Sequence, residues 1–273
     1  MAESLLSMGY ILIQLRRFQE SVEYLVQGVN MQQRLTPGDY SDISNILIHI
    51  GNAYKILGSP ASAFEYAKQG LEMTRRLSQD DHPLCSQAHA LSIMGDASYS
   101  LGKIEEGHNL LKQSIKIGKK FFRDPDPYFA RTLSSMGAKL RARGKLDEAL
   151  NYYIQAYEME QKVYPQDHMA IAETTRNVGY TLYFLGRFSE AKGYFKQAFE
   201  IFTKNYSVDH SESQNTLGAL LSTLQQLGEV GEYNEYKKSL KTNKLFITSS
   251  FAFLLLSVIE LANANVSSTE TLI

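Results

Sequence analysis

Residues 178–198 read VGYTLYFLGRFSEAKGYFKQA, and this stretch decides the fold because its pattern recurs along the 273-residue chain. Its first glycine, Gly179, has equivalents spaced 42 to 44 residues apart at Gly9, Gly51, Gly95 and Gly137. Its second glycine, Gly186, has equivalents at Gly58, Gly102, Gly144 and Gly228. Arg16 holds the second slot in the first copy, and Leu221 holds the first slot in the last copy. A period of roughly 20–50 residues indicates a solenoid built by stacking similar units.

Each copy is predicted to form two helices, and each helix carries one apolar stripe. In residues 41–57, Ile43, Leu47 and Ile50 recur every three or four residues, which is the spacing of one helix face. Residues 61–77 repeat the pattern with smaller side chains, which let neighbouring helices approach closely. Because neither helix can bury its stripe alone, the copies must stack. The sequence therefore predicts an all-α fold of antiparallel helix pairs.

Glycine and acidic residues mark the turns between these helices. The second glycine of each copy suits the left-handed backbone that ends a helix. The turn between copies carries an aspartate, in three cases followed by histidine: Asp39, Asp81-His82, Asp126, Asp167-His168 and Asp209-His210. An aspartate there can accept hydrogen bonds from the free N–H groups at the next helix start and suits the helix dipole. Acidic residues early in the second helices are predicted to act similarly, at Glu20, Glu106, Glu148 and Glu190.

Small and apolar residues follow a fixed order in the second copy: Leu47, Gly51, Tyr54, Gly58, Ala63 and Gly70. This order resembles the tetratricopeptide repeat. The 42-residue period with an Asp-His turn resembles the kinesin light chain type rather than the usual form of 34 residues. The resemblance implies a right-handed superhelical solenoid that binds peptide segments of other proteins. The same fold serves many partners, so the fold alone does not name this one.

The repeat predicts a solenoid over residues 1–240 and a different segment over residues 241–273. Six helical-pair copies are expected at approximately residues 1–36, 37–78, 79–122, 123–164, 165–206 and 207–240. The first and last copies depart most from the pattern, as is typical where stacking stops.

The segment Leu245–Ala262 reads LFITSSFAFLLLSVIELA and follows four lysines between residues 237 and 244. Three interpretations of it stay open: a helix that caps the last repeat, a membrane anchor, or a signal-like segment at the wrong end of a chain. Its 18 residues lie near the lower limit for spanning a bilayer, and Glu260 weakens the membrane interpretation. We expect a cytoplasmic protein, with membrane association through this segment left open.

Composition and missing motifs exclude several classes of function. The net charge of −1 argues against a nucleic-acid partner, because such domains usually carry a basic excess. The single cysteine, Cys85, excludes a disulfide within the chain and fits a reducing compartment. His82, His168 and His210 belong to different copies, so helix capping explains them better than metal coordination does. The glycines that precede lysine lack the spacing of a phosphate-binding loop. We expect no enzymatic activity, no cofactor and no metal site.

The first helices of a stacked array line its concave wall, and the face opposite their buried stripe is the candidate binding surface. It is predicted to contain Asn45, His49, Asn52, Lys55, Asp96, Tyr99, Arg131, Ser134, Arg141, Arg176, Asn177, Tyr180 and Tyr183. Basic residues outnumber acidic ones in this set, and arginine suits bidentate capture of a carboxylate. Asparagine can bond the backbone of an extended peptide. A solvated face without a specific ligand is the alternative, because charges on exposed helix faces are common.

These residues predict a protein-interaction scaffold or adaptor that binds an extended, acidic peptide segment of a partner protein in a concave groove. The alternative hypothesis is a regulatory or sensor subunit. Its superhelix would change pitch on binding a small ligand or a partner domain. Neither the identity of the partner nor the oligomeric state follows from the sequence.

Overall fold

The computed structural model describes residues 1–35, 38, 41–77, 84–121 and 125–238. Over these ranges the chain forms twelve helices and no strand, which confirms the predicted all-α fold class. The helices are α1 (Ala2–Gln14), α2 (Phe18–Leu35), α3 (Ser41–Ile56), α4 (Pro60–Leu77), α5 (Leu84–Ser100), α6 (Ile104–Phe121), α7 (Pro127–Ala142), α8 (Leu146–Val163), α9 (Met169–Phe184), α10 (Phe188–Asn205), α11 (Ser211–Leu227) and α12 (Val230–Lys238).

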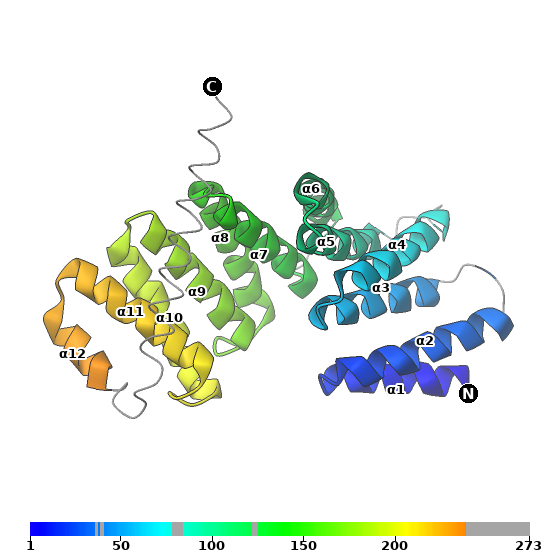
Figure 1. Cartoon of the computed structure of the whole chain (residues 1–273), viewed down its shortest axis with the longest axis horizontal. Helices are drawn as coiled ribbons and strands as arrows, with labels where there is room; N and C mark the ends of the chain where they lie inside the picture. The colour runs from blue at the N-terminus through cyan, green and yellow to red at the C-terminus, as the bar shows by residue number, and fades with distance from the viewer. Residues whose placement is uncertain (36–37, 39–40, 78–83, 122–124, 239–273) are drawn as a thin grey trace, which may run out of the picture. The chain divides into compact units, whose positions relative to one another are not determined.

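Two compact units divide the chain, with the boundary after residue 124. Unit 1 contains the helix pairs α1/α2, α3/α4 and α5/α6, and unit 2 contains α7/α8, α9/α10 and α11/α12 (Figure 1). We call the odd-numbered helices first helices and the even-numbered ones second helices. The division of residues 1–240 into six copies stays a prediction, and the segment 241–273 lies outside the described residues.

The cores form where the apolar stripes of neighbouring helices meet. In unit 1, Ile46 and Ile50 of α3 share an apolar cluster with Leu25 of α2. In unit 2, Ile171 of α9 packs in a cluster with Phe202 of α10. Each cluster joins one second helix to a first helix, so stacking buries what a single helix would expose.

The second glycines end their helices as predicted. The φ angles of Gly58, Gly102, Gly144, Gly186 and Gly228 lie between +71° and +78°. This left-handed region is open to glycine without the steric cost that a Cβ atom brings. Arg16, which holds the slot in the first copy, adopts a φ of +58° despite its side chain.

At the turns before α7, α9 and α11, the residue directly before the helix is the one that caps it. Asp126 caps α7 as predicted, because its Oδ1 accepts a hydrogen bond of 2.7 Å from the N–H of Phe129. At the next two turns the cap is the histidine, not the aspartate. His168 Nδ1 accepts from the N–H of Ala170 at 3.2 Å, and His210 does the same at α11. Asp167 stands one residue too early to cap and instead pairs with Lys204.

The capping histidines also stack on an aromatic ring four residues earlier. The rings of Tyr164 and His168 lie 3.9 Å apart between centroids, and those of Tyr206 and His210 lie 3.8 Å apart. The hydrogen bonds to Ala170 and Glu212 confirm the capping expected of His168 and His210. His82 and the aspartates at 39 and 81 lie outside the described residues. Among the described residues no cluster of three or more potential metal ligands occurs.

The acidic residues early in the second helices form ion pairs with the basic residue three positions before them. These pairs are Arg17–Glu20, Lys103–Glu106, Lys145–Glu148 and Arg187–Glu190. Their side chains are exposed, so each pair contributes on the order of 0–1 kcal/mol.

Replacing Asp126 with alanine should lower the free energy of unfolding by about 0.5–2 kcal/mol, the usual cost of losing an N-cap. Asp126→Asn keeps a side-chain oxygen that can accept the same hydrogen bond, so its cost should be smaller. Urea denaturation of both variants measures the difference. Equal losses in the two variants would show that the cap is not what Asp126 contributes.

The last helix is held differently from the others, because α12 has no fully buried residue. Two ion pairs connect α10 to this end of the chain: Lys192–Glu229 at 2.7 Å and Lys196–Glu232 at 2.6 Å. A pocket of about 300 Å³ lies between α11 and α12, with Leu224 and Tyr233 in its lining. Tyr236 of α12 also packs its ring on Phe199 of α10, so both ion pairs and an aromatic contact hold this end of the chain.

No helix in the described part of the chain is long and apolar enough to cross a bilayer. The segment Leu245–Ala262, to which the membrane and capping interpretations apply, lies outside that part.

Candidate functional site

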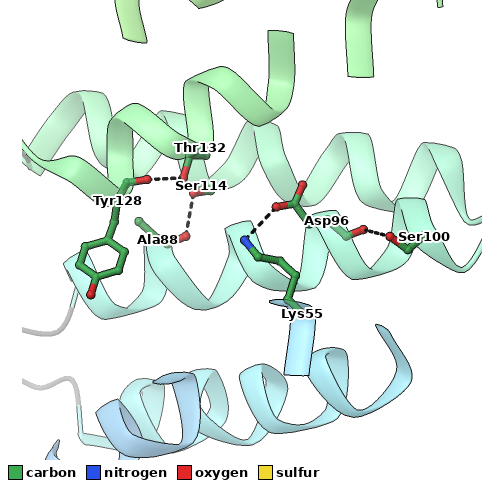
Figure 2. Close-up of polar contacts among 7 residues, drawn as sticks. All are labelled: Lys55, Ala88, Asp96, Ser100, Ser114, Tyr128 and Thr132. Carbon is green, nitrogen blue, oxygen red and sulfur yellow. Dashed lines mark hydrogen bonds and ion pairs between the residues drawn. The ribbon is translucent and has the colours of Figure 1, made fainter. Parts of the chain in front are cut away.

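First helices of successive repeats contact each other at α3/α5, α7/α9 and α9/α11, and the side chains that face the next first helix form the candidate site. We call this surface the first-helix face. In unit 1 the ammonium of Lys55 on α3 donates to Asp96 on α5 at 3.2 Å (Figure 2). The hydroxyl of Ser86 on α5 donates to Asn45 Oδ1 on α3 at 2.7 Å. Three predicted site residues, Asn45, Lys55 and Asp96, thus contribute to the contact between α3 and α5, at two places ten residues apart on α3.

His49 occupies a half-buried position on the same face of unit 1. Its ring makes an edge contact with Tyr10 of α1, with 5.6 Å between centroids. Burial lowers the pKa of His49, and the nearby His89 lowers it further. The imidazole is therefore neutral at physiological pH, so His49 adds a hydrogen-bonding group to the face and no charge.

In unit 2 the contacts run from α7 through α9 to α11. The hydroxyls of Ser134 and Thr174 lie 3.3 Å apart. Arg176 forms an ion pair with Glu212 of α11, and its guanidinium lies 4.9 Å from the centroid of the Phe202 ring. The hydroxyl of Tyr180 donates to a backbone carbonyl of α11 at 3.5 Å, the long end of the hydrogen-bond range.

These contacts change the charge available to a ligand. The predicted set carries Lys55, Arg131, Arg141 and Arg176, but Lys55 and Arg176 each hold a carboxylate of the next first helix. Neither Arg131 nor Arg141 forms an ion pair within residues 125–238. Arg131 is exposed and lies over the ring of Tyr128 at 5.5 Å.

Arg141 is the least satisfied cation of the first-helix face. Its Nε is buried and has no hydrogen-bond acceptor among the described residues. The guanidinium lies close to the phenols of Tyr153 and Tyr180. Burial raises the pKa of both phenols, although Arg141 opposes this rise, so both stay protonated at neutral pH. The phenol oxygen of Tyr153 accepts a hydrogen bond from the guanidinium of Arg141, but no carboxylate within residues 125–238 pairs with this cation.

Other predicted site residues point to their own repeat rather than to the next one. The hydroxyl of Tyr99 lies 3.2 Å from His108 Nδ1 on α6, and the ring of Tyr183 packs at 5.1 Å on Phe188 of α10. Asn52 and Asn177 are half-buried on α3 and α9. The prediction that all of these residues bind a ligand stays a prediction.

Sequence reasoning missed the partners that lie one repeat further on. Glu212 is the clearest case, because it neutralises Arg176 from a distance of 36 residues in the chain. It belongs to the last copy, where Leu221 replaces the first glycine and the register is harder to follow. Opposite charges separated by about one repeat, as in Lys55 and Asp96, were the signal that could have found it.

Comparison with known proteins gives matches along much of the chain. Models described as tetratricopeptide repeat match residues 2–34, 44–84 and 128–204, which together make up more than half of the sequence. No curated protein matches.

Many solved structures match this fold, and three of them illustrate the match. The kinesin light chain-like repeats of Podosopora anserina are 18% identical, with a TM-score of 0.60, and the match covers 76% of this chain and 100% of that one. BtubC (BKLC) from P. vanneervenii is 14% identical over 88% of this chain and 92% of its own, with a TM-score of 0.67. The Rap conjugation gene regulator of plasmid pLS20, in complex with the Phr* peptide, is 14% identical over 98% of this chain and 75% of its own, with a TM-score of 0.63.

Proposed function

Because this chain is a tetratricopeptide repeat protein, we propose that it is a scaffold or adaptor that binds an extended, acidic peptide segment of a partner protein on its first-helix face. The observation that carries this proposal is Arg141, a half-buried cation of the first-helix face that forms no ion pair within residues 125–238. A carboxylate of a ligand would supply the missing counter-charge and accept charge-assisted hydrogen bonds from the guanidinium.

The half-buried polar residues around such a carboxylate suit the rest of an extended peptide. Asn177 offers both a donor and an acceptor, which is what the backbone of a peptide requires. Ser134 adds a hydroxyl next to α9. Lys55 and Arg176 contribute less to an acidic ligand than their charge suggests, because each already pairs with a carboxylate.

Replacing Arg141 with glutamate should weaken binding of an acidic peptide by about ten- to a hundredfold, since it removes a hydrogen bond to a charged group and adds repulsion. The probe is a peptide selected from a library of random 12-residue peptides displayed on phage, and fluorescence anisotropy measures its affinity. Lys162→Glu makes the same change of charge at an exposed position of α8 and should change the affinity less than about twofold. A wild-type affinity in the Arg141→Glu variant would contradict the proposal.

A second candidate function is that of a regulatory or sensor subunit. Its support is that Lys55–Asp96 and Arg176–Glu212 each join successive first helices, so a ligand that competes for either cation would change how the repeats pack. The Rap regulator with a similar fold is itself described in complex with a peptide. Small-angle scattering separates the two functions. A sensor should change its radius of gyration when the selected peptide binds, and an adaptor should not.

A further inference from the structure

We propose that the pocket between α11 and α12 binds the apolar segment Leu245–Ala262 of the same chain, with one of its phenylalanine side chains inside. The pocket has a volume of about 300 Å³, and Gln225, Val230 and Tyr233 contribute to its lining. The segment lies outside the described residues and begins seven positions after Lys238, where α12 ends. Neither the pocket nor the segment belongs to the first-helix face, so this proposal stands apart from the proposed function.

The pocket occupies the place of a ring pair in the preceding copy. There the ring of Tyr183 on α9 packs on Phe188 of α10, with 5.1 Å between the centroids. The same positions of the last copy carry Gln225 and Val230, and both line the pocket. Phe188 is half-buried, whereas Val230 is 66% exposed. The last copy therefore lacks both rings at these positions, and the space that they leave suits an aromatic side chain.

The pocket lies on the side of the helix pair that faces the next part of the chain. Asn234 lines the pocket, and its equivalent in the preceding copy is Lys192. Lys192 pairs at 2.7 Å with Glu229, which directly precedes α12, so in that copy the position contacts the next copy. In the last copy, Asn234 and Val230 are both exposed. Among the described residues, the surface that a following copy would cover is thus open at the pocket.

The chain after α12 is long enough to bring the segment to the pocket. Val230 lies eight residues before Lys238, which is about 12 Å along the helix at 1.5 Å per residue. Residues 239–244 link Lys238 to Leu245, and six residues in extended form span at most about 20 Å. A segment tethered by so short a linker has an effective concentration on the order of 1 mM. Even a weak contact is therefore well populated within one chain.

The composition of the segment matches the pocket. Its phenylalanines are Phe246, Phe251 and Phe253, and its only charged side chain is Glu260. Apolar side chains that stay in water are unfavourable, and burial against Val230 and Tyr233 removes part of this cost. The aromatic rings also contribute ring-to-ring contacts with Tyr233.

The linker carries charge that suits α12. Lys241 and Lys244 precede the segment. Glu235 of α12 is exposed and has no ion pair within residues 125–238. Opposite charges within a Debye length of about 10 Å attract each other. This attraction favours a linker that runs back along α12, as the proposal requires.

Binding in the pocket excludes the membrane interpretation of the same segment. A bilayer anchor needs all 18 residues of Leu245–Ala262, because this length is near the lower limit for spanning. The phenylalanine that fills the pocket is then not available to the bilayer. The two interpretations therefore predict different neighbours for the segment, and crosslinking distinguishes them.

Asn234→p-benzoylphenylalanine places a photo-crosslinker at the rim of the pocket in the full chain. After irradiation, mass spectrometry should find crosslinks to residues 245–262 in a product with the mass of a single chain. The matched control is Asn109→p-benzoylphenylalanine, at an exposed asparagine of α6 that does not line the pocket. Because the control lacks the tethered neighbour, its yield of such crosslinks should be lower by at least about tenfold.

Val230→Glu in the chain with the crosslinker at position 234 tests whether the pocket is what holds the segment. A charge in the pocket should lower the crosslink yield at least about fivefold, because an apolar side chain then buries it. Ile104→Glu is the matched control, since Ile104 holds the equivalent position of α6 and is 40% exposed. It should leave the yield unchanged, and circular dichroism of both variants verifies that they fold.

Three results overturn the proposal. They are the absence of crosslinks to residues 245–262, crosslinks to these residues only between two chains, and a yield that Val230→Glu leaves unchanged. Vesicles of phosphatidylcholine and phosphatidylserine provide the membrane arm of the test, and the crosslink yield should be the same in their presence. Flotation of the full chain with the vesicles, together with loss of the crosslink, overturns the proposal in favour of a membrane anchor.

Discussion

Replacing Glu160 with glutamine is expected to raise the free energy of unfolding by on the order of 3 kcal/mol at about pH 8 and to change it little at about pH 4. Glu160 lies on α8 and is 5% exposed. Burial raises the pKa of its carboxyl from 4.5 to about 7. A hydrogen bond with Thr174 and the charge of Arg131 lower the pKa, while Glu173 raises it.

The pH window follows from the direction of this pKa change. The folded protein holds the proton more tightly than the unfolded chain, because its pKa of about 7 lies above 4.5. The stability that the protonated carboxyl contributes is complete below about pH 4.5 and is lost as the pH rises through about 7. Glutamine keeps a neutral group at every pH, so the variant should not lose this stability.

Urea denaturation of wild type and variant at several pH values tests this expectation. Glu158→Gln is the control, because Glu158 is exposed on the same helix and its substitution should change the free energy of unfolding by less than about 0.5 kcal/mol. A gain for Glu160→Gln that is equal at low and high pH would contradict the titration of a buried carboxylate.

The second large effect is expected at Gly107, where alanine should lower the free energy of unfolding by about 1–3 kcal/mol. Helices α5 and α6 are so close there that an added Cβ would lie 2.6 Å from Cδ2 of Tyr99 and 2.8 Å from the carbonyl oxygen of Gly95. The tyrosine ring can turn away, but the backbone oxygen moves only if the helices separate. The close approach of the two helices therefore depends on glycine at this position.

Gly193→Ala should act in the opposite direction. Gly193 lies within α10, is exposed, and has open space where the Cβ would stand. Alanine should therefore stabilise the protein by about 0.5–1 kcal/mol through its helix propensity alone. Thermal denaturation of both variants measures the expected loss of stability in Gly107→Ala and the expected gain in Gly193→Ala. Destabilisation of equal size in both would show that space around the Cβ is not the deciding factor.

The sequence predicted the helix pairs and their ends because these depend on local patterns. Gly186 and its equivalents specify a left-handed turn whatever the surroundings, and the apolar stripes specify which face is buried. The capping residue was predicted correctly at Asp126 and wrongly at Asp167 and Asp209. The difference is a single inserted histidine, His168 or His210, which moves the start of α9 or α11 one position further on.

The candidate site was less predictable because its charges depend on contacts between repeats. Helical periodicity placed Lys55 and Arg176 on the first helices, but it contains no information on which carboxylate of the next repeat reaches them. The burial of Glu160 could not be foreseen either, since an acidic residue at that position reads as an exposed one. Both features arise from packing over 14 to 41 residues of chain, as in Glu160–Thr174 and Lys55–Asp96.

The attachment of α12 has a consequence for the behaviour of the protein in different solvents. Lys192–Glu229 and Lys196–Glu232 connect this end to α10, and α12 itself buries no residue fully. Dissolved ions screen such partly exposed pairs, while they leave the apolar contacts of the inner helices intact. Raising the ionic strength is therefore expected to loosen the attachment of the last helix to α10 more than it weakens the packing of the helices before it.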